Sequence, residues 1–183
     1  MQLGTGLSLL LGGARSGKSD IAVQLGLAWR GGVTFVATAT AGDQDMAQRI
    51  KRHQDDRPSD WGLVESPTFG ASDVATVPAE SLLLLDCVTL LVSNLMFADD
   101  TDDDVIAHAE ALAAALAARP SPSIVISNEV GMGIHPDTAL GRRYRDLLGY
   151  VNRVVARHSN AAAFVVAGKA LPLQDFVIDA AHP

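Results

Sequence analysis

The amino-acid sequence predicts an α/β domain in which helices flank a mostly parallel central sheet. Its 183 residues suit a single domain covering 1–183. A hydrophobic content of 48% allows a sizeable core. Short apolar runs alternate along the chain with longer segments of helical spacing, which is the pattern of parallel strands joined by helices.

The first half of the chain supplies three of the predicted strands and two helices. Residues 7–11 and 33–38 are short and apolar, and 81–86 is continuously apolar, as expected for a strand covered on both faces. Apolar spacing predicts a helix at 20–29. A second helix is predicted at 43–56, where aspartates come first and basic residues follow.

Weaker signals lie around these elements. Residues 61–65 are a short extended candidate, and 70–78 is interpreted as a loop or a weak helix. A helix is predicted at 88–97. The acidic cluster at 99–104 is interpreted as a loop whose aspartates cap the next helix, at 102–118, with a metal site as the alternative.

The last third of the chain repeats the alternation. Pro120 and its neighbours end the preceding helix, and 123–127 is a further buried strand. Apolar spacing predicts a helix at 138–158, and 162–167 is the last predicted core strand. The chain from Gly168 onward is interpreted as a tail.

Charge and cysteine content limit the class of protein. The formal net charge of −7 argues against a dedicated nucleic-acid binder, because such proteins usually carry a basic excess. The single cysteine, Cys87, excludes an internal disulfide and is expected to be a buried apolar residue in a reducing compartment. No basic leader and no apolar run of membrane-spanning length are found, so we expect a cytoplasmic protein without a membrane span.

A phosphate-binding pattern, G-x-x-x-x-G-K-[ST], lies between the first predicted strand and the first predicted helix. Glycines let the backbone wrap around phosphate oxygens, and the helix start adds the positive end of a dipole. Lys18 would reach the outer phosphates and the Ser19 hydroxyl would ligate Mg²⁺, so the pattern predicts a nucleoside triphosphate site. Its residues are Gly12, Gly13, Ala14, Arg15, Ser16, Gly17, Lys18 and Ser19.

Two acidic residues follow buried strands and are candidates for the metal or for proton transfer. Asp86 ends the third strand, where an acidic residue helps to hold Mg²⁺ in phosphate-loop enzymes, although an aspartate there also suits a helix cap. Glu129 follows the 123–127 strand and is the rival for the metal or general-base role. Residue types alone leave the choice open.

A basic stripe is predicted on the 43–56 helix. Arg49, His53 and Arg57 are four residues apart and therefore share one face. Two guanidinium groups beside an imidazole can bind phosphate and offer one nucleophile or base, but a solvated basic face has the same spacing. His135, in a loop with two glycines, stays open as a second histidine candidate.

Several pieces occur together and in order, and they give the chain a family resemblance. They are Gly12 to Ser19, Val36 to Ala39, Met46 to Pro58, Trp61, Leu84 to Thr89, Asn128 to Ile134 and Val165 to Gly168. From about Leu9 to Leu173 the chain resembles the bifunctional adenosylcobinamide kinase / adenosylcobinamide-phosphate guanylyltransferase family of cobalamin biosynthesis. The pieces R-I-x-x-H-x-x-x-R-P and N-E-V-G-x-G discriminate best.

The resemblance implies a phosphate-loop NTPase domain of RecA-like type, a homotrimer, and two reactions. In the first, a hydroxyl of adenosylcobinamide takes the γ-phosphoryl group of ATP or GTP. In the second, a histidine attacks the α-phosphorus of GTP, pyrophosphate leaves, and GMP passes to adenosylcobinamide phosphate. The family's nucleophile corresponds to His53, which coincides with the histidine of the basic stripe.

Further site residues follow from the resemblance position by position. Besides Lys18 and the phosphate loop, the nucleotide contacts are Ala37, Thr38, Ala39, Gln54, Asp55, Asp56, Arg57, Glu65 and Asp86. Ser19 and Asp86 are the expected Mg²⁺ ligands. At position 86 the family often carries glutamate, so the shorter Asp86 changes the reach of that contact.

Two other functions compete with the bifunctional enzyme. An ordinary phosphate-loop kinase for a small molecule would use His53 only to bind phosphate. A nucleotide-dependent switch would bind GTP without catalysing transfer. Covalent labelling of the protein by GTP distinguishes the bifunctional enzyme from an ordinary kinase. A product assay distinguishes it from a nucleotide switch.

Overall fold

The computed structural model describes residues 5–39 and 58–175, which form a seven-stranded sheet with helices on both faces. The strand order is β3-β2-β4-β5-β1-β6-β7. All neighbouring strands are parallel except β7, which is antiparallel to β6. The strands are β1 (Leu7–Gly12), β2 (Val33–Ala37), β3 (Gly62–Glu65), β4 (Leu82–Asp86), β5 (Ser123–Asn128), β6 (Ser159–Val166) and β7 (Lys169–Leu173). The predicted fold class is confirmed.

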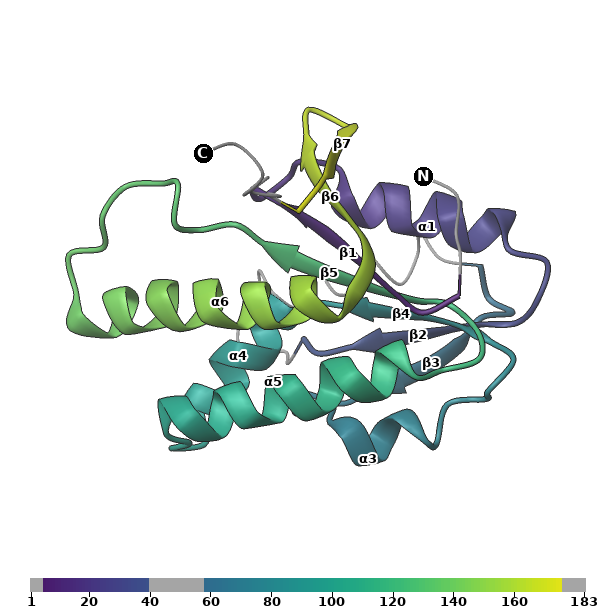
Figure 1. The fold of residues 1–183 in the computed structure, drawn as a ribbon, viewed down its shortest axis with the longest axis horizontal. Helices are drawn as coiled ribbons and strands as arrows, with labels where there is room; N and C mark the ends of the chain where they lie inside the picture. The colour runs from purple at the N-terminus through teal and green to yellow at the C-terminus, as the bar shows by residue number, and fades with distance from the viewer. Residues whose placement is uncertain (1–4, 40–57, 176–183) are drawn as a thin grey trace, which may run out of the picture.

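The helices divide unequally between the two faces of the sheet (Figure 1). One face is covered by α1, and the opposite face by α3, α4, α5 and α6. The helices are α1 (Lys18–Ala28), α3 (Ala71–Val74), α4 (Val88–Phe97), α5 (Asp102–Ala117) and α6 (Ala139–His158). The helix predicted at 43–56 lies outside the described residues.

The apolar strand β4 shows why the sheet needs both layers. Leu83 and Leu85 pack into the core under α4, α5 and α6, whereas Leu82 and Leu84 pack into the core under α1. All four side chains are fully buried. Because successive side chains of a strand point to opposite faces, an uninterrupted apolar run is what a doubly covered parallel strand requires.

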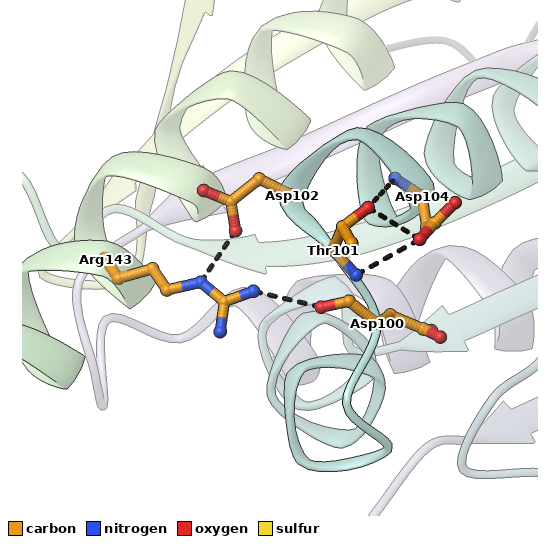
Figure 2. A network of polar contacts seen from close by, with 5 residues as sticks. All are labelled: Asp100, Thr101, Asp102, Asp104 and Arg143. Atoms are coloured by element: carbon orange, nitrogen blue, oxygen red, sulfur yellow. Dashed lines mark hydrogen bonds and ion pairs between the residues drawn. The ribbon is translucent and has the colours of Figure 1, made fainter.

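The acidic stretch at 99–104 organises the start of α5. Thr101 is the N-cap, its hydroxyl accepts from Asp104 N at 3.2 Å, and its own N–H donates to Asp104 Oδ2. Figure 2 shows this reciprocal box beside the ion pair that joins Asp102 to Arg143 of α6 at 2.7 Å. Arg143 also donates to Asp100 O at 3.0 Å. The prediction of capping aspartates is confirmed, since three of them occupy the first turn.

Two predictions about the chain need correction. The segment after Gly168 is not a tail, because Lys169–Leu173 forms β7 and pairs with β6 from Ala162↔Leu173 to Val166↔Lys169. Cys87 is partly buried, whereas full burial was predicted. The signal for β7 was weak because every residue of this edge strand is exposed, so no buried apolar pattern marks it.

Candidate active site at the carboxyl edge of the sheet

The candidate site is built where the parallel strands end on one edge of the sheet. Gly12 of β1 lies opposite Asn128 of β5, and Asp86 of β4 lies opposite both Ile126 of β5 and Ala37 of β2. Since β5 lies between β1 and β4, the phosphate loop and Asp86 flank the end of β5. Ligands of open α/β sheets bind at such carboxyl ends.

The phosphate loop adopts backbone conformations that few residue types accept. Arg15 has φ of 57° and Gly17 has φ of 97°, both left-handed, and α1 begins directly afterwards at Lys18. A Cβ on Gly12 would lie 2.2 Å from the carbonyl oxygen of Val165 in β6. Glycine is therefore required at Gly12 by close packing and favoured at Gly17 by its backbone angle.

The ammonium group of Lys18 points back into the loop. It donates to Gly12 O at 2.9 Å, to Gly13 O at 2.7 Å and to Ser16 Oγ at 3.3 Å. The side chain is buried, and this burial lowers the pKa of Lys18, while the nearby Asp86 carboxylate opposes the shift. A buried cation held by carbonyl oxygens at a helix start is well placed to bind phosphate.

Ser19 and Asp86 meet in the structure although they are far apart in sequence. The Ser19 hydroxyl donates to Asp86 Oδ2 at 2.9 Å, which joins the start of α1 to the end of β4. A hydroxyl and a carboxylate oxygen at this distance suit Mg²⁺, which prefers hard oxygen ligands and completes its shell with water and substrate phosphate. The donor set therefore fits the metal that the sequence predicts.

Thr38 fastens the end of β2 to the end of β4. Its hydroxyl donates to Cys87 O at 2.7 Å and accepts from Cys87 N at 2.8 Å, and its own N–H donates to Asp86 O at 3.1 Å. Burial raises the pKa of the Cys87 thiol to about 12, and Asp86 adds to this rise. Cys87 is thus a neutral thiol at physiological pH.

The remaining predicted contacts lie further along the same edge. Ala37 ends β2 next to Asp86, and Glu65 ends β3 opposite Ala37. Glu65 is exposed and lies four strands from β1, or about 19 Å at the usual spacing of strands. Glu65 is therefore far from the phosphate loop. Ala39 directly follows Thr38 and is partly buried.

The predicted histidine nucleophile cannot be placed against these groups. His53, Gln54, Asp55, Asp56 and Arg57 lie outside the described residues, and so does Arg49. His135 is described: it is exposed, and its Nδ1 lies 2.7 Å from the guanidinium of Arg145 on α6. This contact between His135 and Arg145 was not predicted from the sequence.

The hydrogen bonds of Gly168 and Asn94, which support the site, were not predicted from the sequence. Gly168 N donates to Ser16 O at 2.8 Å, and Gly168 Cα lies 3.1 Å from where a Cβ of Gly17 would be. Asn94 of α4 donates to both Thr38 O and Pro67 O at 2.8 Å. Val165 to Gly168 was identified only as one piece of the family pattern, without a predicted contact to the phosphate loop, and Asn94 was not singled out in the sequence.

Within the described part of the chain, no three His, Cys, Asp or Glu side chains gather in a way that could hold a metal ion by themselves. The Ser19 and Asp86 pair would accordingly need oxygen atoms from substrate and water to complete a Mg²⁺ shell. Among the same residues, no helix is both long enough and apolar enough to cross a bilayer.

Comparison with solved structures shows the fold. The chain superposes on an ATPase of a bacterial type III secretion system with a TM-score of 0.53 and 12% identity, over 87% of this chain and 50% of that one. It superposes on the RadB recombinase with a TM-score of 0.50 and 19% identity, over 87% and 73% of the two chains. The chain therefore has the fold of RecA-like phosphate-loop NTPases.

Comparison of sequences reaches further than the fold. The bifunctional adenosylcobalamin biosynthesis protein CobP of Pseudomonas aeruginosa is 39% identical over 167 residues, covering 91% of this chain and 96% of the relative. CobU of Escherichia coli K12, which carries the same description, is 36% identical over 87% of this chain and 95% of its own. Residues 8–173 match the sequence model of cobinamide kinase / cobinamide phosphate guanyltransferase. The chain belongs to the cobinamide kinase / cobinamide phosphate guanyltransferase family.

Proposed function

We propose that this protein phosphorylates adenosylcobinamide with ATP or GTP and then transfers GMP from GTP to adenosylcobinamide phosphate. The observation that carries the proposal is the phosphate loop with its Ser19–Asp86 pair, in a chain that matches the family over residues 8–173. The whole chain would act as one domain over 1–183, in the cytoplasm and as a homotrimer.

The first reaction transfers the γ-phosphoryl group. The substrate hydroxyl oxygen forms a bond to the γ-phosphorus, the bond from that phosphorus to the bridging oxygen breaks, and the nucleoside diphosphate leaves with the electron pair. Lys18, once it releases Gly12 O and Gly13 O, would stabilise negative charge on the transferred group. Ser19 and Asp86 would hold Mg²⁺, which when bound neutralises phosphate charge.

The second reaction uses a histidine relay in this proposal. A neutral nitrogen of His53 attacks the α-phosphorus of GTP, and pyrophosphate leaves. A phosphate oxygen of adenosylcobinamide phosphate then attacks the same phosphorus, the N–P bond breaks, and adenosylcobinamide-GDP forms. Dividing one displacement into two steps is the general advantage of a covalent intermediate.

The nucleotide contacts proposed for these steps extend along one edge of the sheet. The loop from Gly12 to Ser19 would hold the phosphates, and Ala37, Thr38 and Ala39 would contact the nucleotide beside Asp86. Glu65 stands about 19 Å from β1, at four strand spacings, so it would serve an end of the ligand remote from the phosphate loop. Gln54, Asp55, Asp56 and Arg57 would contact GTP next to His53.

The covalent step is tested with GTP labelled at the α-phosphate. We expect acid-labile, base-stable label on the protein, because a phosphorus–nitrogen bond has these properties, and no label when the γ-phosphate carries the isotope. His53→Ala should abolish labelling, and His135→Ala, which changes an exposed histidine of the described chain, is the matched control. Equal labelling of wild type and His53→Ala would refute the relay.

Product assays test the remaining parts of the proposal. Conversion of adenosylcobinamide to its phosphate with either nucleotide demonstrates the kinase, and conversion of that phosphate with GTP demonstrates the guanylyltransferase. Kinase activity without the second conversion would leave an ordinary phosphate-loop kinase. GTP binding without either conversion would leave a nucleotide switch. Sedimentation equilibrium of the purified protein tests the homotrimer.

A further inference from the structure

We propose that Glu129 is the group that accepts the proton of the substrate hydroxyl during phosphoryl transfer. This inference rests on the proposed kinase reaction and adds to it a base for the attacking oxygen. The hydroxyl loses its proton as the new oxygen–phosphorus bond forms, and a carboxylate near the γ-phosphate can receive it. Three features of the structure select Glu129 for this role.

The first feature is the position of Glu129 between the two halves of the phosphate site. It follows directly after β5, the strand that separates β1 with its phosphate loop from β4 with Asp86. Its backbone N–H donates to Gly12 O at 3.1 Å, the same oxygen that accepts from Lys18 Nζ. The residue is thus attached by its main chain to the first residue of the loop.

The second feature is the rigid support of the strand end that carries Glu129. Asn128 N donates to Thr89 Oγ1 of α4 at 2.9 Å, and Asn128 O accepts from Asn152 of α6 at 3.0 Å. Asn152 also accepts from Ser127 Oγ at 2.6 Å. Two helices therefore hold the end of β5 in place, which is how a catalytic side chain is kept close to its productive position.

The third feature is the environment of the carboxylate groups at this edge. Asp86 is hydrogen-bonded to Ser19 and fits the metal, and Glu65 lies four strands from β1. Glu129 has one oxygen, Oε1, bonded to Gly131 N at 2.5 Å, and we assign proton acceptance to Oε2. A Cβ on Gly131 would lie 2.9 Å from Oε1, so glycine at that position accommodates the carboxylate.

The chemical step balances with these groups. The hydroxyl proton moves to Glu129 Oε2 as the oxygen bonds to the γ-phosphorus, the bond to the bridging oxygen breaks, and the nucleoside diphosphate leaves. Glu129 afterwards returns the proton to solvent. The guanylyl reaction has no such requirement, because the attacking oxygen of adenosylcobinamide phosphate is already ionised near neutral pH. The two reactions of one protein therefore give an internal comparison.

The test measures both reactions in the full-length protein carrying Glu129→Gln. The glutamine oxygen can still accept from Gly131 N, so the local structure is retained while the base is removed. We expect kcat of adenosylcobinamide phosphorylation to fall about 100-fold or more, the usual contribution of a general base, with KM for the nucleotide and the guanylyl reaction unchanged. Glu129→Asp should recover part of the lost kcat.

Controls separate this role from a structural one. Glu110→Gln makes the same chemical change on α5, in a residue that pairs with Arg157 and His158, and should leave both reactions at wild-type rates. Phosphorylation by Glu129→Gln at the wild-type rate would overturn the proposal, and so would an equal loss of both reactions. A wild-type protein without phosphorylation would instead refute the proposed kinase function.

Discussion

Two neighbouring glycines in the phosphate loop differ sharply in the space around them. A Cβ on Gly12 would collide with Val165 O at 2.2 Å, whereas a Cβ on Gly13 would meet no heavy atom within 4 Å. We expect Gly12→Ala to destabilise the protein by about 1–3 kcal/mol, as overpacking does, and Gly13→Ala to leave it nearly unchanged. Urea unfolding of both variants measures this, and equal midpoints would contradict the steric explanation.

At the level of single residues, the sequence predicted what local motifs encode. The glycine spacing, Lys18 and the polar residue ending an apolar strand were enough to bring Ser19 and Asp86 to one edge, and the structure joins them at 2.9 Å. The bonds of Asn94 and Gly168 could not be predicted, because no local motif marks Asn94 as a partner of Thr38 or Gly168 as a partner of Ser16. A side chain's role in such bonds depends on topology, and residue type does not reveal it.

The start of α5 gives a prediction at the level of an element. Thr101 caps the helix, and its hydroxyl both accepts from Asp104 N and donates to Asp104 Oδ2 (Figure 2). Thr101→Ala should cost about 1 kcal/mol of stability, the usual effect of losing such a cap, and Thr101→Ser should retain most of it. Urea unfolding compares the variants, and equal loss with serine would show that the methyl group matters instead.

The contact between α5 and α6 should depend on pH. Glu110 accepts from His158 Nε2 at 2.9 Å and pairs with Arg157, and the hydrogen bond from His158 holds the pKa of Glu110 below its usual 4.5. A lowered carboxyl pKa gives stability that is present above 4.5 and is lost as the pH falls through the lowered value.

Glu110→Gln should therefore be less stable than wild type near neutral pH, and the difference should disappear in acid. Urea unfolding of both proteins at about pH 7 and about pH 3 measures this dependence. Added salt should reduce the difference at neutral pH, since the Glu110 side chain is 39% accessible to solvent. If the stability difference between the two proteins persists at acidic pH, packing rather than the charge of Glu110 is its cause.

Strands with a continuous apolar run were the most predictable elements, although the mostly exposed β3 was also found, as the extended candidate at 61–65. The apolar strands β1, β4 and β5 were found within a residue of their observed bounds, because burial on both faces produces a continuous apolar run. β7 is wholly exposed, and β6 begins at the polar Ser159 and Asn160, ahead of the apolar run. The edge strand β7 was missed because pairing at a sheet edge requires no apolar side chain, whereas β6 was predicted at 162–167 and only its polar first residues were missed.

The molecule as a whole should unfold as one unit if residues 1–183 are one domain. Trp29 and Trp61 both pack against the core beneath α1, whereas α4, α5 and α6 lie on the opposite face. Tryptophan fluorescence thus follows one layer, and far-UV circular dichroism is dominated by helices of the other. We expect coincident urea transitions from the two signals, and separated midpoints would show that the layers unfold independently.

The order of the strands is a property of the whole molecule that alternating runs did not reveal. β1 lies between β5 and β6, although it is the first strand of the chain. The alternation of strands and helices predicts a parallel sheet, but which strands are neighbours depends on how the two core layers pack together. For that reason the sequence predicted which residues lie at the carboxyl edge of the sheet. It did not predict that β5 lies between the phosphate loop and Asp86.

The contact of Gly168 with Ser16 has a consequence for the newly made chain. The glycine motif leaves the ribosome well before β6, the strand beside β1 that ends in Val166, and before the turn that ends in Gly168. A growing chain therefore displays the motif long before it can build the loop. Nucleotide capture therefore has to wait for β6 and Gly168, so retention of nucleotide marks a chain in which β6 has paired with β1.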